Sequence, residues 1–119
     1  MNRATIVGRL GHDPEIQTGA SGKEYARIRI ATNDGWGDRK QTNWHSCTVF
    51  GGQCVLLKGT QKGSIVGVSG RIEYKDKDGG GRYTNIIVEL GGLEVLWRAG
   101  DRDEPKGNDQ AVSFEDLPF

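Results

Sequence analysis

The sequence predicts a small all-β domain that is followed by a short polar tail. Its 119 residues suffice for one compact domain, and its 19 glycines suit a protein with many turns. Several segments alternate between apolar and polar residues, as half-buried strands do. From residue 99 onward the alternation stops, and charged residues, glycine and proline prevail. We therefore expect a folded domain over residues 1–98, a disordered linker over 99–112 and a C-terminal tip over 113–119.

The first two strands are predicted over residues 3–10 and 23–32. The first strand ends at a turn-like segment, Gly11-His12-Asp13-Pro14. In the second strand, one face carries Ala26, Ile28 and Ile30, and the other carries Tyr25, Arg27 and Arg29. Alternate residues of a strand point to opposite faces, so this sheet has an apolar side and a basic, aromatic side.

A polar loop over residues 33–43 and a third strand over residues 44–50 follow. The loop contains Trp36 and the basic pair Arg39-Lys40, and its tryptophan either folds back onto the core or is displayed for a ligand. One face of the strand consists of Trp44, Ser46, Thr48 and Phe50. A core face would place Val, Ile or Leu between the two aromatic residues, so we interpret both of them as displayed.

The rest of the domain is predicted as one short helix and further strands. The helix covers residues 53–58, and the strands cover 64–74 and 82–90, with a hairpin tip at 75–81 between them and a last apolar stretch at 93–97. Gly67 and Gly70 indicate a bulge or strong coiling, which the corners of a small barrel require. Five strands with a helix between the third and the fourth match the OB-fold, a five-stranded barrel that binds oligonucleotides on a curved face.

The net charge of zero conceals an uneven distribution. Residues 1–98 contain 14 Lys and Arg against 10 Asp and Glu, whereas residues 99–119 contain 2 against 6. A solubilising role would explain the acidic charge of the tail. It would not explain why apolar side chains return at the end, in Leu117-Pro118-Phe119. We interpret the tip as a short linear motif that binds partner proteins.

The bulk features narrow the classes of protein that fit. The sequence contains no run of 18 or more apolar residues, so we expect no transmembrane helix. No secretory signal is apparent either, and we therefore expect a cytoplasmic protein. We expect neither enzymatic activity nor a cofactor, because no repeated pair of carboxylates shares a strand face. A zinc site is the alternative for His12, His45, Cys47 and Cys54, but their spacing matches no common zinc pattern. We therefore interpret the two cysteines as small, partly buried thiols.

Several motifs, in the same order along the chain, resemble the bacterial single-stranded DNA-binding proteins. The apolar pair, glycine, arginine and leucine that lead to Asp-Pro-Glu in residues 6–15 resemble the opening of that family. The segment QTNWHSCTVFG, residues 41–51, resembles its central signature. Residues 82–84 resemble the start of the fifth strand, and the acidic end at 116–119 is similar to the family's Pro-Phe-ended tip. The resemblance covers nearly the whole chain.

This resemblance implies sequence-independent binding and protection of single-stranded DNA in replication, recombination and repair, and hence an association with the nucleoid. It implies base stacking by Trp36, Trp44 and Phe50, with Tyr74 as the nearest aromatic for a further stacking position. It also implies that His45 lies at a subunit interface of a homotetramer. The tip that docks onto partner proteins would include Glu115, Asp116, Leu117, Pro118 and Phe119.

A bound strand also needs cations for its phosphates. The candidates are Arg3, Arg9, Arg27, Arg29, Arg39, Lys40, Lys62 and Arg71. Arg39 and Lys40 rank first, because they lie between two residues for which stacking is implied.

The chain departs from the family pattern in two places. Its β-hairpin near residue 77 is shorter, and Glu73, Asp76 and Asp78 interrupt the basic residues. Alternation from the preceding valines places Tyr74 on the core side unless a bulge resets the register. The linker lacks the family's long Gly-, Gln- and Pro-rich tract. Such a short linker is compatible with a phage- or plasmid-encoded member of the family.

The sequence leaves three alternatives open. The protein could be a dimer, it could prefer RNA, or its OB-fold could dock proteins without binding DNA.

Overall fold

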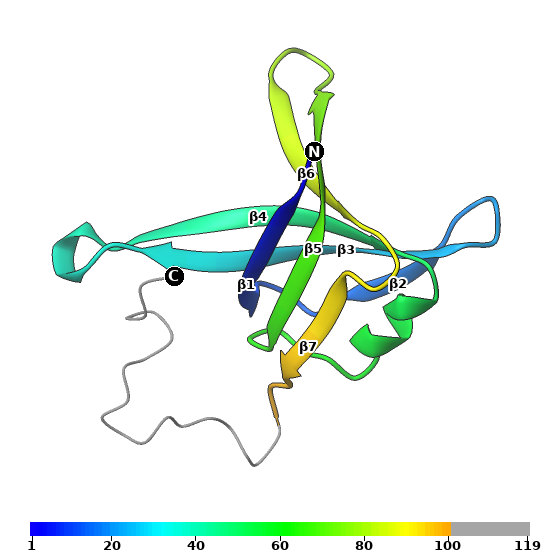
Figure 1. Ribbon diagram of the computed structural model, residues 1–119, viewed down its shortest axis with the longest axis horizontal. Coiled ribbons are helices and arrows are strands. Elements are labelled where there is room, and N and C mark those ends of the chain that lie inside the picture. Colours follow the sequence, from blue (N-terminus) through cyan, green and yellow to red (C-terminus); the bar gives the residue numbers. More distant parts are fainter. Residues whose placement is uncertain (101–119) are drawn as a thin grey trace.

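The computed structural model describes residues 1–100, which form a strongly curved sheet with projecting hairpins (Figure 1). The strands are β1 (Ala4–Leu10), β2 (Glu15–Thr18), β3 (Glu24–Asp34), β4 (Gln41–Phe50), β5 (Ile65–Asp76), β6 (Arg82–Val88) and β7 (Leu93–Trp97). Two short 3-10 helices, η1 (Gly37–Arg39) and η2 (Gly52–Leu57), interrupt them. None of the helices in this part of the chain has the length and apolar character that crossing a membrane requires. The predicted tip and nearly all of the predicted linker lie outside the described residues.

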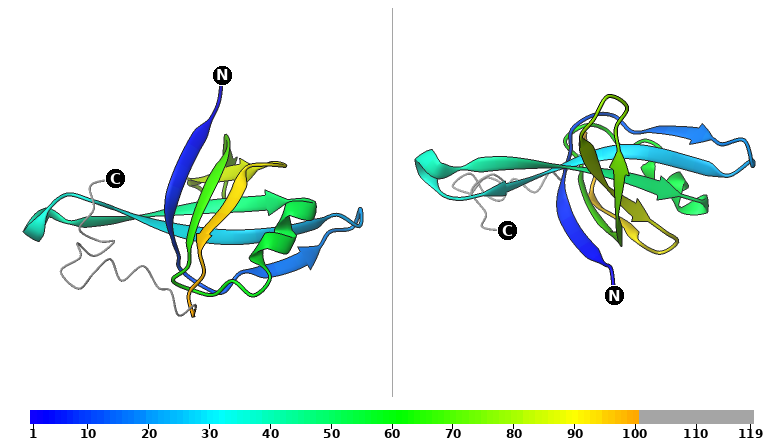
Figure 2. Two further views of the ribbon diagram at one scale, coloured as in Figure 1. Left: turned by 60° about the horizontal axis from the view of Figure 1, so that its bottom comes forward. Right: turned by 90° about the horizontal axis from the view of Figure 1, so that it is seen from above.

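Five of the strands close into a circuit. β1 pairs with β3, β3 with β4, β4 with β6, β6 with β5, and β5 returns to β1. Only β4 and β6 run parallel in this circuit, and the other pairs are antiparallel. In chain order η2 lies between the third and fourth strands of the circuit, β4 and β5. The predicted OB-fold is therefore confirmed, and β2 and β7 extend it by pairing with β3 and β5 (Figure 2).

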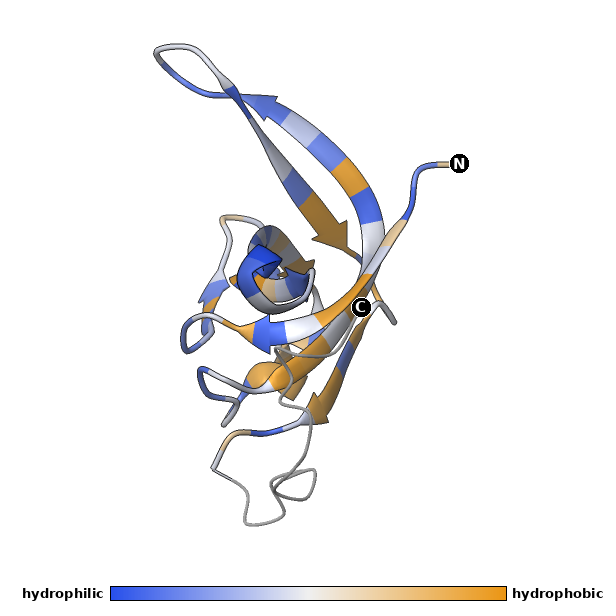
Figure 3. Ribbon diagram, turned by 90° about the vertical axis from the view of Figure 1, so that its left-hand side faces the viewer, coloured by the Kyte–Doolittle hydropathy of each residue, from blue (hydrophilic) through white to orange (hydrophobic). Residues whose placement is uncertain are grey.

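The alternation along β3 separates the core from the surface as predicted. Ile28 and Ile30 are at most 1% exposed, whereas Arg27 and Arg29 are exposed. The core is completed by side chains from the other strands and from η2, among them Leu10, Cys47, Val49, Cys54, Leu57, Val66, Val68 and Val88. Figure 3 shows hydrophobic residues where the strands cross and hydrophilic ones toward the tip of the β5–β6 hairpin.

The β3–β4 hairpin is longer than predicted. The expected loop over residues 33–43 is reduced to residues 35–40, because both strands continue outward as a paired arm (Figure 1). Polar side chains hold this arm together across the ladder. Thr42 donates a 2.7 Å hydrogen bond to Asn33, and Asn43 donates a 2.6 Å bond to Asp34. Polarity alone therefore predicted a loop where cross-strand hydrogen bonds stabilise strands.

Strand β2 is a further element that the sequence analysis missed. It has four residues and pairs with β3, from Glu15 opposite Arg27 to Thr18 opposite Glu24. Ile16 is its apolar residue and packs against the core. A single apolar position is too short a pattern to predict a strand from alternation.

Gly70 lies where β5 changes neighbours. The strand pairs with β7 through Val68 and with β6 from Arg71 onward. A β-carbon on Gly70 would lie 1.9 Å from the Ile87 carbonyl oxygen, so only glycine allows the two backbones to approach this closely. The bulge or strong coiling predicted at Gly67 and Gly70 stays a prediction at these two positions. The register shift of β5 against β7 lies elsewhere, between Ile65 and Val66.

Candidate nucleic-acid interface

A cleft of about 660 Å³ lies between the outer face of the β3–β4 sheet and the β5–β6 hairpin. Tyr25, Arg27 and Arg29 contribute from β3, and Ser46, Thr48 and Phe50 contribute from β4. The hairpin supplies the opposite wall with Arg71, Glu73, Lys75, Tyr83, Asn85 and Ile87. Aromatic rings and cations thus face one another across a hollow that a single strand of nucleic acid could enter.

Tyr25 and Phe50 form an aromatic pair on the floor of this cleft. They are directly opposite on β3 and β4, with ring centroids 6.3 Å apart and an angle of 35° between the ring planes. The Tyr25 hydroxyl donates a 2.7 Å hydrogen bond to Gln17 on β2, which holds the tyrosine ring in place. Phe50 remains 39% exposed, as expected for a displayed aromatic. Alternation along the strand predicted Tyr25 on the basic, aromatic face, but Tyr25 was not among the predicted stacking residues.

Trp44 lies further along the same face of β4, six residues before Phe50 and beyond the residues that line the cleft, and is 49% exposed. At about 3.3 Å per residue, roughly 20 Å separates the two positions, which leaves room for several nucleotides. The Arg29 guanidinium lies 5.0 Å from the centroid of the indole ring, within the range of a cation–π contact. Parity therefore predicted correctly that Trp44 and Phe50 share an exposed face.

Gly11 allows the indole ring of Trp44 to take this position, since a β-carbon there would lie 2.4 Å from a ring carbon. We expect Gly11→Ala to displace the ring, change the tryptophan emission and weaken nucleic-acid binding by about fivefold, roughly 1 kcal/mol. The free energy of unfolding should fall by less than about 1 kcal/mol, because the ring is only half buried. Gly52→Ala is the matched control, since its added carbon meets no atom within 4 Å. Unchanged emission in Gly11→Ala would contradict this role for the glycine.

Trp36 stands apart from the cleft. It precedes η1 at the tip of the β3–β4 arm and is 63% exposed. Packing onto the core is therefore wrong, and display for a ligand stays a prediction. Arg39 and Lys40 follow it at the same tip, so the arm carries its own aromatic and basic group. The structure does not bring this group together with Phe50.

Tyr74 and Tyr83 lie on opposite faces of the β5–β6 hairpin. Tyr83 is opposite Lys75 and lines the cleft, whereas Tyr74 does not line it and is 62% exposed. The expected core-side position of Tyr74 is wrong, although its parity with Val68 is kept, because the hairpin extends beyond the closed sheet at this point. Its part in stacking stays a prediction. Tyr83 is a further cleft aromatic that was not predicted. It shares its face of β6 with Asn85, and the core residues Ile86 and Val88 lie on the other face, so alternation could have indicated it.

Three of the eight predicted phosphate contacts line the cleft, namely Arg27, Arg29 and Arg71. Lys75 joins them and was not predicted. The other five candidates lie elsewhere. Arg39 and Lys40 are on the arm, Lys62 is exposed before β5, and Arg9 lies 5.8 Å from the Trp97 ring. Arg3 lines a second hollow of about 350 Å³, which also includes Arg71 and the loop before β7.

The family model described as "Single-strand binding protein family" matches residues 1–91, which contain every wall of this cleft. The chain belongs to the single-strand binding protein family. Its structure is similar to that of a Plasmodium falciparum SSB solved in complex with ssDNA, with a TM-score of 0.67 and 26% sequence identity. The match covers 82% of this chain and 94% of that chain. The family resemblance inferred from the sequence is thus confirmed.

His45, for which the family resemblance implies an interface position, lies on another surface. With Thr5, Ile6, Val7, Thr32 and Asp34 it lines a largely apolar hollow of about 560 Å³. Its Nε2 is 2.8 Å from the Thr32 hydroxyl. Burial lowers the pKa of His45 below its ordinary value, and the opposing influence of nearby Asp34 is smaller. An uncharged histidine in an apolar hollow suits a surface that packs against protein.

The cysteines and histidines do not assemble around a common point. Within residues 1–100, no group of three or more His, Cys, Asp or Glu side chains is arranged to hold a metal ion. Cys47 and Cys54 are both free thiols, and they are buried more fully than predicted. Burial raises the pKa of the Cys47 thiol to about 12, so the thiol stays protonated and unreactive at neutral pH.

Proposed function

We propose that this protein binds and protects single-stranded DNA without reading its sequence. The observation that carries the proposal is the cleft in which Tyr25, Phe50 and Tyr83 share a surface with four cationic side chains. Every base offers a flat π-face, so stacking on aromatic rings tolerates any sequence. The similarity to a Plasmodium falciparum SSB in complex with ssDNA supports this choice of ligand.

The bound strand would run along the exposed face of β4 from Phe50 to Trp44, with the arm tip at Trp36 as a further contact. Its bases stack on these rings, and its phosphates pair with Arg27, Arg29 and Arg71. Arginine is suited to both tasks, because its planar guanidinium pairs with phosphate and also stacks on rings. Arg39 and Lys40 would hold phosphates at the arm. The proposal assigns no catalytic step to any residue.

Quenching of the intrinsic tryptophan fluorescence by oligo-dT tests this function directly. We expect saturable quenching and an affinity that falls with salt. If the three arginines of the cleft, Arg39 and Lys40 each neutralise one phosphate at about −0.7 per phosphate, the logarithmic slope is about −3.5. Arg29→Gln should reduce the magnitude of that slope by about 0.7. If no single-stranded nucleic acid quenches the fluorescence, the proposal fails, and an OB-fold that docks proteins becomes the better account.

We further propose that the protein acts in replication, recombination and repair at the nucleoid, as a homotetramer that recruits other proteins. The supporting observations are the family membership and the apolar hollow around His45. Recruitment is assigned to the acidic tip, from Glu115 to Phe119. Deletion of residues 113–119 should abolish capture of partner proteins and leave the affinity for oligo-dT within about twofold, because stacking supplies most of the binding.

Burial of His45 in the folded chain predicts that the stability depends on pH. The pKa of His45 is lowered from 6.5 in the folded chain, so the unfolded chain binds more protons below that value. The contribution of His45 to the free energy of unfolding is therefore fully present above the pKa that His45 has in the unfolded chain. It is lost as the pH falls toward the pKa that His45 has in the folded chain. We expect the free energy of unfolding, at fixed protein concentration, to decrease between about pH 7.5 and pH 5.5. His45→Asn should flatten this dependence, whereas His12→Asn should leave it in place.

A further inference from the structure

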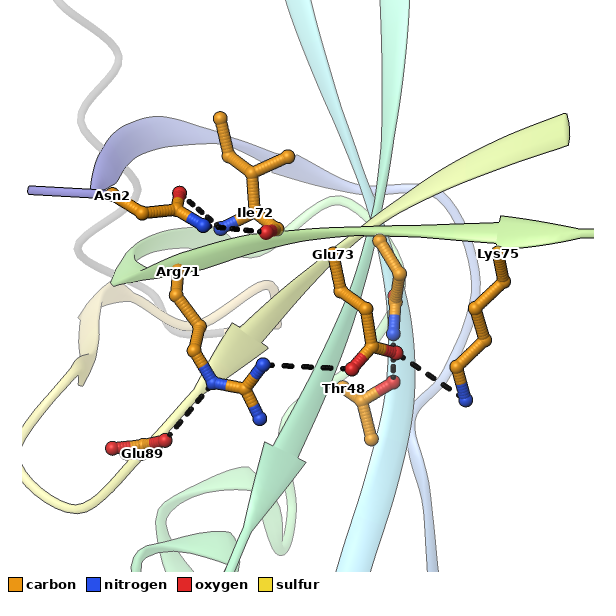
Figure 4. A network of polar contacts seen from close by, with 8 residues as sticks. Asn2, Thr48, Arg71, Ile72, Glu73, Lys75 and Glu89 are labelled. Carbon is orange, nitrogen blue, oxygen red and sulfur yellow. Dashed lines mark hydrogen bonds and ion pairs between the residues drawn. The ribbon is translucent and has the colours of Figure 1, made fainter.

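One carboxylate lies inside a cleft that is otherwise suited to a polyanion. On the hairpin wall, Arg71, Glu73 and Lys75 alternate along β5 and point to the same side, and all three line the cleft (Figure 4). Glu73 is directly opposite Asn85 on β6. A negative charge between two cations opposes phosphate binding, so its position calls for another partner.

The ion pairs of Glu73 leave part of its hydrogen-bonding capacity unused. Its Oε2 is 3.5 Å from an Arg71 nitrogen, and its Oε1 is 3.3 Å from Lys75 Nζ. The lysine contact does not have hydrogen-bond geometry, so Oε1, which is shielded from solvent, lacks a hydrogen-bond partner among the described residues. A carboxylate can accept about four hydrogen bonds, and a buried acceptor without a donor is energetically costly.

Glu73 is not required to neutralise the positive charge of Arg71. The Arg71 Nε lies 3.3 Å from Glu89, whose side chain is 68% exposed and does not line the cleft. Arg71 therefore has a second acidic partner, and only Glu73 faces the space that a base would occupy. The side chain of Glu73 is 26% exposed, so it is partly accessible from the cleft.

The neighbours of Glu73 complete a site for a flat polar molecule. Asn85 donates a 3.0 Å hydrogen bond from Nδ2 to the Thr48 hydroxyl, which orients its amide within the cleft. One N–H and the carbonyl oxygen of Asn85 remain for a ligand. Tyr83, on the same wall, offers a ring on which a base can stack.

We propose that Glu73, with Asn85 and Tyr83, forms a base-recognition subsite that favours bases carrying an exocyclic amino group over thymine and uracil. This inference rests on the proposed binding of single strands and adds a preference at one position. A base stacked on Tyr83 directs its edge toward Glu73, which accepts hydrogen bonds from the amino group. Phosphates draw Lys75 and Arg71 outward, so the carboxylate becomes free to accept these bonds.

The chemistry of the base edges explains the direction of the preference. Cytosine presents an amino donor at position 4, where uracil presents a carbonyl oxygen. The ring N–H of uracil lies between two carbonyl oxygens, so a carboxylate that approaches it meets two further acceptors. Glu73 therefore attracts the edge of cytosine and repels that of uracil at the same place.

The test compares oligo-dC with oligo-dU of about 12 nucleotides, within the range that one OB-fold covers. These pyrimidines have similar size and stacking area, and binding to the full-length protein is followed by tryptophan quenching. Glu73→Gln keeps the shape of the side chain, and its amide can donate to a carbonyl oxygen. We expect the ratio of the oligo-dC affinity to the oligo-dU affinity to fall about fivefold to tenfold in this variant.

Glu89→Gln is the matched control, because it removes a carboxylate from Arg71 outside the cleft. It should tighten the binding of both oligonucleotides equally and leave the ratio unchanged. If Glu73→Gln also tightens both equally, the carboxylate tunes only the charge of the cleft and the proposed subsite is wrong. If neither oligonucleotide binds to the unaltered protein, the proposed function itself fails, which is a separate result.

Discussion

Replacing Trp44 and Phe50 together by alanine is expected to weaken the binding of single-stranded DNA about thirtyfold or more. In proteins of this kind each stacked base contributes about 1–3 kcal/mol, so two lost stacks amount to about 2–6 kcal/mol. Both rings are on the exposed face of β4 and are 49% and 39% exposed, so the fold depends little on them. The affinity is best measured by the anisotropy of a labelled oligo-dT, since the variant lacks one of the tryptophans.

Tyr74→Ala is the control variant for this result. Tyr74 is 62% exposed and lies on the face of the β5–β6 hairpin that is turned away from Tyr83. Its replacement should leave the affinity for a short oligonucleotide unchanged. A loss that appears only with longer strands would indicate that the strand wraps around the hairpin to reach it. An affinity that survives in the Trp44 and Phe50 double variant would show that the strand does not follow β4.

Gly70→Ala is expected to lower the free energy of unfolding by about 3 kcal/mol, at the upper end of the usual cost of overpacking. The added carbon would lie 1.9 Å from the Ile87 carbonyl oxygen and 2.7 Å from its carbonyl carbon. These are backbone atoms of the neighbouring strand, so they cannot move away as a flexible side chain could. The closed sheet must open slightly between β5 and β6. Denaturant titration followed by tryptophan emission measures the change.

Gly67→Ala on the same strand is the control for this effect. The nearest atom to its added carbon is a Val7 methyl at 3.5 Å, an ordinary contact. Alanine is preferred to glycine within a strand by about 0.5–1 kcal/mol, so this variant should be unchanged or slightly more stable. If both variants lose the same free energy of unfolding, any added side chain on β5 disturbs the sheet. The close approach at Gly70 would then not be the cause.

The exposed aromatic face of β4 could be predicted because side-chain direction in a strand is a local property. Trp44 and Phe50 are separated by an even number of residues, so they share a face wherever the strand is placed. The same reasoning placed Ile28 in the core and Arg29 on the surface. The order of the strands around one short helix was sufficient to predict the OB-fold, because few small closed sheets have this plan.

Local patterns were misleading where a distant partner decides the outcome. Tyr74 follows the parity of a core strand, yet the hairpin has left the closed sheet by that point and the ring is exposed. Residues 41–43 are polar like a loop, yet the opposite strand supplies hydrogen bonds that keep them in a ladder. Gln53 resembles a surface residue of a short helix. It is buried and donates to the carbonyl oxygens of Phe50, Val88 and Glu89, which ties η2 to the end of β6.

The sequence by itself determined the fold class, the family and the face of β4 on which Trp44 and Phe50 are displayed. These properties depend on neighbours along one strand and on motifs read in order. Only the tertiary structure decided which residues meet across the cleft, and it brought Tyr83 and Glu73 opposite Tyr25 and Phe50 while leaving Trp36 on a separate arm. The reason is physical. Strand pairing sets these distances, and the pairing of β6 with both β4 and β5 joins segments that the sequence keeps far apart.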